Sequence, residues 1–229
     1  MKDISLIAFD ADDTLWECQN HFETVEREYC EILNSYAPAD KISKTLFSIE
    51  TANMPLLGYG SKAFLLSLLE NAVEVSNGKV KAEEIRKIIL LGKRLLQLSG
   101  SPIDGVEPTL KRLQDIGRYQ MVVFTKGELL DQENKFQRSG LSPYFEDIIV
   151  VSDKTEKSYQ QLCKRFSIDI NQLLMVGNSF RSDIEPVLKL GGWAAYIPFH
   201  TTWQHEVTEE YEHPHLVKLN SFSQLVSLL

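Results

Sequence analysis

The chain has 229 residues, of which 43% are hydrophobic and 24% are charged, so it is long enough for one large globular domain or two small ones. Its formal net charge of -8 argues against nucleic acid or an anionic membrane surface as the main partner. No apolar run approaches the ~20 residues that would span a membrane. Three cysteines without paired spacing indicate reduced thiols in a cytoplasmic protein.

The first predicted element is residues 5–9, SLIAF, a short apolar run that is typical of a strand buried on both faces of a parallel sheet. Residues 17–100 then show helical periodicity without any strand signal. Helices are predicted over about 22–33, 61–72 and 82–98, and the Pro- and Gly-containing stretch 52–60 is expected to break the pattern. This block indicates a small all-helical domain inserted after the first strand.

From residue 105 onward, helical segments alternate with short apolar runs. Strands are predicted at 119–124, 148–151, 173–176, 194–197 and, more weakly, 216–219. Helices are predicted at 108–116, 128–139, 156–166, 182–190 and after Ser221. Such alternation is typical of a parallel sheet with helices on both faces. We therefore predict an α/β core from residues 1–16 and 101–229, with residues 17–100 as the inserted helical domain.

Polar side chains collect where the predicted strands end, and open parallel sheets bind ligands at that edge. Those residues are Asp10, Asp12, Asp13 and Thr14 after the first strand, Thr125 and Lys126 after the second, Lys154 after the third, and Asn178 and Asp183 after the fourth. Because the carboxyl ends of parallel strands meet at one edge, we expect these side chains to lie close together.

The residue types at this edge suggest phosphoryl transfer. Asp10 can attack phosphorus and form an acyl phosphate. Asp12 can protonate the leaving oxygen and later deprotonate water, and we expect the neighbouring acids to raise its pKa toward that task. Mg²⁺ would neutralise the acidic cluster, with Asn178 and Asp183 as further oxygen ligands. Thr125 can donate a hydrogen bond to a phosphoryl oxygen.

Lys154 can balance negative charge on the nucleophile and on the transferring group. Lys157, one helical turn later, is the alternative lysine, but it already belongs to the predicted helix. The Asp13 side chain is expected either to point to solvent or to cap the following turn. The two histidines at 200 and 205 show no metal-ligand spacing and receive no role.

Four stretches carry a resemblance when they are read in order. They are DADDTLW at 10–16, VVFTKG at 122–127, VVSDKTEKSY at 150–159 and MVGNSFRSDIEP at 175–186. Together they resemble the four motifs of the haloacid dehalogenase-like (HAD) hydrolase superfamily. The resemblance implies a Rossmann-like core with a helical cap of the C1 type inserted after the first motif, which residues 17–100 fit.

The resemblance also implies roles for individual residues. Asp10 would be the nucleophile and Asp12 the general acid/base. Thr125, Lys126 and Lys154 would bind or stabilise the phosphoryl group. The implied metal ligands are Asp10, the Asp12 backbone carbonyl, Asn178 and Asp183. Asn178 departs from the family pattern, which commonly has Asp there, so the site loses one formal charge and Mg²⁺ affinity should be lower unless Asp183 or Asp13 compensates.

Four functions remain open at this point. The first is a Mg²⁺-dependent phosphatase that acts on a small phosphorylated metabolite. A 2-haloacid dehalogenase needs neither a metal nor a general acid at Asp12, and a phosphomutase would need cap residues that the sequence does not identify. A non-catalytic phosphate-binding protein is favoured only by Asn178. The phosphatase fits the residues best, and the oligomeric state does not follow from the sequence.

Overall fold

The computed structural model describes residues 3–229, which form two compact units. The α/β unit comprises the described residues up to Gln19, Gly100–Lys126 and Gln132–Leu229, and the helical unit comprises Asn20–Ser99 and Gly127–Asp131. We expected the chain to divide after residues 16 and 100, and these units divide after residues 19 and 99. Residues 1 and 2 of the expected core segment lie outside the described residues.

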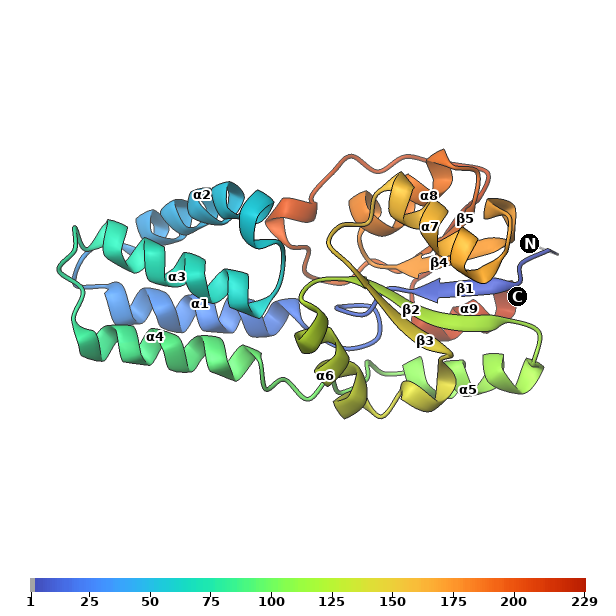
Figure 1. Ribbon diagram of the computed structural model, residues 1–229, viewed down its shortest axis with the longest axis horizontal. Coiled ribbons are helices and arrows are strands. Elements are labelled where there is room, and N and C mark those ends of the chain that lie inside the picture. The colour runs from blue at the N-terminus through green and yellow to red at the C-terminus, as the bar shows by residue number, and fades with distance from the viewer. Residues whose placement is uncertain (1–2) are drawn as a thin grey trace. The chain divides into compact units, whose positions relative to one another are not determined.

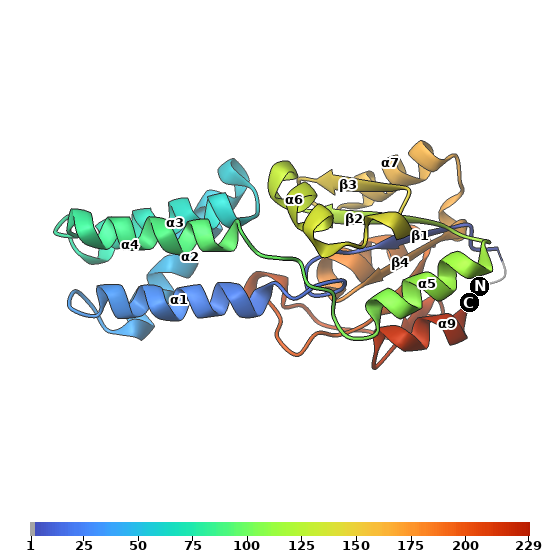
Figure 2. The same ribbon diagram turned by 90° about the horizontal axis from the view of Figure 1, so that it is seen from below.

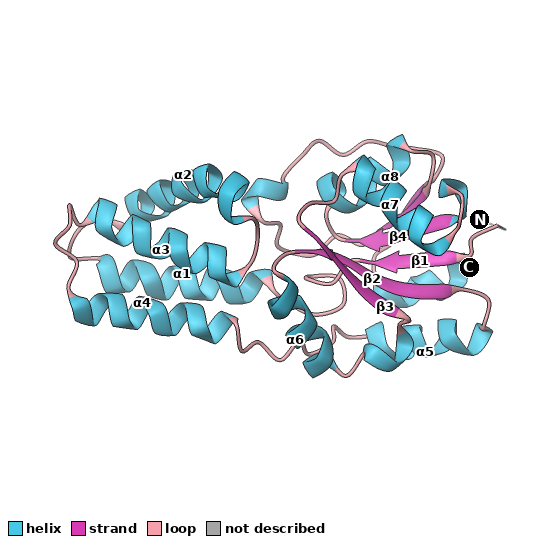
Figure 3. Cartoon of the chain, in the orientation of Figure 1, coloured by secondary structure: helices cyan, strands magenta, loops and turns pink. Residues whose placement is uncertain are grey.

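The α/β unit contains one six-stranded sheet among its described residues, in the order β3-β2-β1-β4-β5-β6, and each neighbouring pair is parallel (Figures 1 and 3). The strands are β1 Leu6–Phe9, β2 Gln120–Lys126, β3 Asp147–Val151, β4 Leu173–Gly177, β5 Trp193–Tyr196 and β6 Leu216–Lys218. The predicted α/β fold with a Rossmann-like parallel sheet is confirmed. β2 is longer than predicted, so Thr125 and Lys126 form its last two residues.

Helices cover both faces of this sheet, as Figure 2 shows for α5 and α9 on one side and α7 on the other. The helices are α5 Val106–Ile116, α6 Leu129–Ser139, α7 Glu156–Phe166, α8 Glu185–Lys189 and α9 Leu225–Leu228. Single turns occur at η1 Ser142–Tyr144, η2 Ile170–Gln172, η3 Phe180–Ile184, η4 Gln204–Glu206 and η5 Phe222–Gln224.

The alternation of side chains along β1 explains why it is apolar throughout. Ile7 and Phe9 belong to the core under α5 and α9, whereas Leu6 and Ala8 belong to the core under α7 and α8. All four side chains are buried. A central parallel strand between two helical layers has no face left for polar residues, so the polar groups appear only where the strand ends.

The helical unit is built from α1 Gln19–Leu33, α2 Ala39–Leu57, α3 Ser61–Val75 and α4 Ala82–Leu95, whose apolar sides form a separate core. The break predicted across 52–60 is confirmed only for residues 58–60, because α2 continues to Leu57 with Pro55 in its last turn. Asn53 donates to Glu70 at 2.8 Å and to Ser67 at 3.2 Å, which fixes this end of α2 onto α3. These contacts outweigh the backbone hydrogen bond that Pro55 cannot make.

Among residues 3–229, no helix combines the length and the apolarity that crossing a membrane requires.

Candidate active site

The strand order brings the predicted site residues to one edge of the sheet. Asp10 directly follows β1, Thr125 lies near the end of β2, and Asn178 directly follows β4. Because β1 is hydrogen-bonded to β2 on one side and to β4 on the other, these three positions are neighbours across the sheet. The Asp10 amide also donates to the Val176 carbonyl at 2.9 Å, which fixes the start of the loop that carries the acidic cluster.

Lys154 joins two buried carboxylates. Its ammonium contacts Asp10 Oδ1 and lies 2.7 Å from Asp183 Oδ1, and its side chain is only 1% exposed. Burial by itself lowers the pKa of Lys154, but the two carboxylates outweigh that effect and raise it. The structure therefore brings Lys154 to Asp10, whereas the alternative, Lys157, is exposed on α7.

The Asp10 carboxylate is strongly perturbed by its surroundings. Burial raises the pKa of Asp10 to about 7, Asp183 adds to the increase, and Lys154 opposes it. Thr14 Oγ1 donates to Asp10 Oδ2 at 3.2 Å. A carboxylate that is poorly solvated and held by an ammonium and a hydroxyl is positioned to act as a nucleophile rather than as a solvated surface acid.

The Asp12 carboxylate is held by three donors. Lys135 Nζ lies 2.6 and 2.8 Å from its two oxygens, Gln132 Nε2 donates at 2.7 Å, and Trp16 Nε1 donates at 2.8 Å. Burial favours a higher pKa, but the charge of Lys135 and the hydrogen bonds from Lys135, Gln132 and Trp16 outweigh it, so the pKa of Asp12 is lowered. Our prediction of a raised pKa is wrong, because it counted the neighbouring acids and missed Lys135.

Lys135 and Gln132 are site residues that the sequence did not reveal. They lie three positions apart on α6, so both side chains project from the same side of that helix. Two polar residues at this spacing are common on solvated helices, and nothing in the sequence connects them to Asp12. The only indication in the sequence was that the helix carrying Gln132 and Lys135 directly follows the strand that ends near Thr125, at the edge where the other site residues were expected.

Asp13 serves the backbone rather than the reaction. Its φ of 62° is in the left-handed region, and its carboxylate accepts hydrogen bonds from the Cys18 amide at 2.8 Å and from the Gln19 amide at 3.1 Å. These amides lie at the start of α1, where backbone donors lack helical partners. Of the two positions expected for this side chain, the structure has the capping one.

Oxygen atoms from several groups converge beside Asp10. One end of the Asn178 amide lies 3.3 Å from Asp10 Oδ2, 3.2 Å from the Asp12 main-chain oxygen and 3.1 Å from Thr14 Oγ1. Neighbouring oxygen ligands of one octahedral Mg²⁺ lie about 3 Å apart, because each metal–oxygen distance is about 2.1 Å. With its amide oxygen at this end, Asn178 completes a donor set that fits a hard divalent cation. With its nitrogen there, it donates to the same oxygens.

Asp183 lies deeper in the same edge, and both of its carboxylate oxygens already have donors. Oδ1 accepts from Lys154, and Oδ2 accepts from the Ser179 amide at 3.0 Å. Within residues 3–229, no group of three His, Cys, Asp or Glu side chains is arranged to hold a metal ion. A cation at this edge would therefore depend on Asn178 and the Asp12 carbonyl in addition to carboxylates.

Thr125 and Lys126, the two predicted phosphate-binding residues of β2, differ in their surroundings. Thr125 is buried at the sheet edge, where its hydroxyl donates only weakly to the Lys126 carbonyl at 3.4 Å. The Lys126 ammonium contacts Glu206 and donates to Ser182 Oγ at 3.0 Å. Glu206 lies on η4 and was not predicted as a site residue. The structure thus brings Thr125 to the Asp10 edge and joins Lys126 to a carboxylate from a distant loop.

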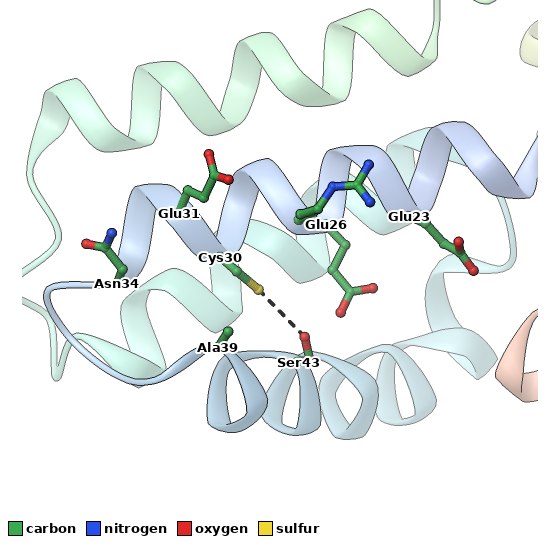
Figure 4. A pocket seen from close by; sticks show the side chains of 8 residues that line it. Glu23, Glu26, Cys30, Glu31, Asn34, Ala39 and Ser43 are labelled. Carbon is green, nitrogen blue, oxygen red and sulfur yellow. Dashed lines mark hydrogen bonds between the residues drawn. The ribbon is translucent and has the colours of Figure 1, made fainter.

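The helical unit has a cavity of its own, of about 430 Å³, between α1 and α2 (Figure 4). It is lined by Glu23, Glu26, Arg27, Cys30, Glu31, Asn34, Ala39 and Ser43. In Figure 4 the Cys30 thiol approaches the Ser43 hydroxyl, and the two atoms are 3.6 Å apart. None of the predicted site residues lines this cavity, so it is not the candidate active site.

Comparisons with known proteins agree with the geometry. Residues 4–191 match the sequence profile of haloacid dehalogenase-like hydrolases. A glyceraldehyde 3-phosphate phosphatase of Pyrococcus abyssi is 27% identical over 206 residues, which are 82% of this chain and 79% of the relative.

Solved structures that resemble this chain also include haloacid dehalogenase-like hydrolases. A haloacid dehalogenase-like family hydrolase from Xanthomonas campestris aligns with a TM-score of 0.89 and 33% identity, covering 99% of this chain and 90% of its own. A HAD-hydrolase of Bacillus subtilis bound to magnesium has a TM-score of 0.66 at 16% identity, covering 98% of both chains. Dehalogenases share this fold at 16–20% identity, so the fold alone does not select the reaction.

Proposed function

The chain belongs to the haloacid dehalogenase-like hydrolase family, and we propose that it is a Mg²⁺-dependent phosphomonoester hydrolase. Its substrate would be a small phosphorylated metabolite, and its intermediate an aspartyl phosphate on Asp10. The observation that carries the proposal is the buried Asp10 carboxylate, held by Lys154 on one oxygen and bordered by the Asp12 carbonyl and the Asn178 amide on the other. The similarity to a phosphatase supports it.

In the first step, an oxygen of Asp10 attacks phosphorus as the bond to the leaving oxygen breaks. The phosphoryl group moves to Asp10, and the alcohol departs with a proton that the protonated form of Asp12 donates to its oxygen, which leaves Asp12 ionised. Lys154 compensates charge on the attacking carboxylate, and the Thr125 hydroxyl is available to a phosphoryl oxygen. The lowered pKa of Asp12 means that only a small fraction of it carries the proton that a poor leaving group needs.

In the second step, a water molecule attacks phosphorus, the Asp10–phosphorus bond breaks, and the free carboxylate is regenerated. The ionised form of Asp12 accepts the proton of that water. Lys135 and Gln132 hold this form ready, so the observed contacts suit the base role better than the acid role.

A bound Mg²⁺ would supply positive charge to the acidic cluster and to a phosphate oxygen. Asp10, the Asp12 carbonyl and Asn178 would hold it. Asp183 lies nearby, because Asp10 and Asp183 both contact Lys154. A dehalogenase would use neither a cation nor a second carboxylate beside the nucleophile, so Asp12 and the oxygen cluster favour the phosphatase. The three cysteines are free and buried, which supports a proposed location in a reducing compartment such as the cytoplasm.

The test is hydrolysis of p-nitrophenyl phosphate and of a panel of phosphorylated metabolites with Mg²⁺ or with EDTA. We expect activity with Mg²⁺, none with EDTA, and loss of both turnover and phosphoenzyme in Asp10→Asn. Asp115→Asn, which removes an exposed carboxylate of α5, is the matched control and should retain activity. Equal activity in EDTA, or full activity in Asp10→Asn, would contradict the proposal.

A further inference from the structure

Glu206 is enclosed by donors that the proposed reaction does not use. Its carboxylate contacts the Lys126 ammonium and accepts hydrogen bonds from the hydroxyls of Ser179 and of Ser182, the latter at 2.7 Å. The Lys126 and Glu206 side chains are only 16% and 10% exposed. One ammonium and two hydroxyls that converge on one carboxylate make an arrangement that recognises an anion.

This carboxylate reaches the cluster from a surface segment. Glu206 ends η4 in the long connection between β5 and β6, and residues 207–212 after it are all exposed. Burial favours a higher pKa for Glu206, but Lys126 and the two serine hydroxyls lower it, so the side chain is an anion at neutral pH. The occupant of the cluster is therefore a charged group on a solvent-exposed segment, which is also held by Arg181 at the His205 carbonyl and by Tyr196 and Lys218 at Glu210.

The donors lie beside the proposed site. Lys126 is the chain neighbour of Thr125 at the end of β2, Ser179 follows Asn178, and Ser182 precedes Asp183. The strands β2 and β4 that lead to them flank β1, which ends directly before Asp10. The cluster thus joins the two strand ends on either side of the nucleophile.

We propose that Lys126, Ser179 and Ser182 form a second anion subsite, which Glu206 occupies in this structure and which binds a carboxylate of the substrate when Glu206 withdraws. This rests on the proposed function, because the phosphate of the same substrate would lie at Asp10. The single ammonium balances one negative charge, as in the contact with Glu206, so the group is a carboxylate rather than a second phosphate. The substrate class is a phosphorylated carboxylic acid.

Glu206 then competes with the substrate carboxylate for the subsite formed by Lys126, Ser179 and Ser182. A phosphate ester with a carboxylate replaces the interactions that Glu206 gives up, whereas an ester without one leaves Lys126 without its anion. Removing Glu206 frees the subsite, so it should raise affinity most for ligands that carry the carboxylate.

The first experiment tests the subsite without phosphate chemistry. Glu206→Ala removes the carboxylate and leaves a space that acetate can fill, and acetate binding is followed by NMR titration. We expect one acetate site in Glu206→Ala, and none in the wild type, in Glu206→Ala/Lys126→Met or in the control Glu209→Ala on the same segment. Absence of acetate binding in folded Glu206→Ala would overturn the proposal.

The second experiment compares 3-phosphoglycerate and 2-phosphoglycolate with glycerol 3-phosphate, which lacks the carboxylate. The wild type should prefer a carboxylate ester in kcat/KM, and Glu206→Ala should increase that preference about tenfold. Glu206→Gln, which keeps the side-chain size, should change it in the same direction and serves if Glu206→Ala does not fold. Acetate binding without any such preference would overturn the assignment to a substrate group. If Glu206→Ala binds acetate but no variant hydrolyses any ester, the proposed function has failed rather than the subsite.

Discussion

Lys135 and Asp12 form a two-point contact, with Nζ 2.6 Å from one carboxylate oxygen and 2.8 Å from the other, although they lie 123 residues apart in the sequence. The lysine side chain is 4% exposed and the Asp12 side chain 28%, so the ammonium is shielded from solvent while the carboxylate keeps partial access to it. An ammonium in this position stabilises the ionised carboxylate. Lys135 therefore sets how often Asp12 carries a proton.

Lys135→Met should raise the pKa of Asp12, because it removes the main charge that opposes burial and leaves only the hydrogen bonds from Gln132 and Trp16. A larger fraction of Asp12 is then protonated at neutral pH, which helps an alkyl leaving group and matters little to p-nitrophenol. The ratio of alkyl to aryl phosphate turnover should rise about tenfold, which corresponds to a change of about one pKa unit. The measurement is kcat on both esters between pH 5 and 8.

Lys111→Met, which removes an exposed lysine of α5, is the control and should leave this ratio unchanged. A ratio in Lys135→Met equal to that of the wild type across the pH range would show that Lys135 does not govern the protonation of Asp12.

The sequence was sufficient to find the residues whose positions follow from strand order. Asp10, Thr125 and Asn178 come at or next to the ends of apolar runs, and parallel strands place such ends at one edge. Lys135 and Glu206 could not be found in this way. Lys135 is one polar residue on a helix, and its partner depends on how α6 packs. Glu206 comes from an irregular connection whose path has no periodic signal.

The same limit explains the error in the pKa of Asp12. From the sequence, the nearest charges are the acids at 10 and 13, which would raise its pKa. In the structure, the decisive charge is distant in the chain and close in space. Local charge patterns indicate a pKa only where tertiary contacts add no stronger partner.

Asn178→Asp should strengthen Mg²⁺ binding. The substitution adds a carboxylate next to Asp10 and the Asp12 carbonyl, and a hard cation binds a charged oxygen more strongly than an amide oxygen. We expect the dissociation constant to fall about tenfold, and Asn178→Ala to weaken binding by removing the oxygen. Calorimetric titration of the substrate-free protein with MgCl₂ provides the measurement. Equal affinities in all three proteins would exclude Asn178 from the metal site.

Gly177→Ala should disable the site through Asp183. A Cβ at Gly177 would lie 2.2 Å from Asp183 Oδ2 and 2.4 Å from its Cγ, so the carboxylate has to move away from Lys154. Small displacements of catalytic groups cost about 10²-fold in rate, and we expect a loss of that size in kcat. Gly191→Ala is the control. The φ of 91° at Gly191 strains an alanine there, but the added Cβ would meet no other atom within 4 Å. Gly191→Ala should lower stability but keep turnover. A normal kcat in Gly177→Ala would show that turnover does not depend on the position of the Asp183 carboxylate beside Lys154.

The helical unit should show a pH dependence that comes from Glu50. Burial and the nearby Glu26 raise the pKa of Glu50 to about 7, compared with 4.5 for an ordinary glutamate. Between these values the folded chain binds more protons at this position than the unfolded chain, so stability falls as the pH rises. The destabilisation begins above pH 4.5 and is complete above about pH 7.

Glu50→Gln keeps the size of the side chain and removes its titration. At pH 8 it should be more stable than the wild type by about 1 to 2 kcal/mol, since each unit of pKa difference corresponds to about 1.4 kcal/mol and partial exposure reduces the effect. At pH 4.5 the two proteins should be nearly equal, because Glu50 is then protonated in the folded wild type. Urea unfolding across this range measures the difference, and Glu31→Gln, an exposed change on the α1 wall of the cavity in Figure 4, is the control. A stability gain in Glu50→Gln that does not vary with pH would mean that shape or hydrogen bonding, and not the buried charge beside Glu26, sets the stability at this position.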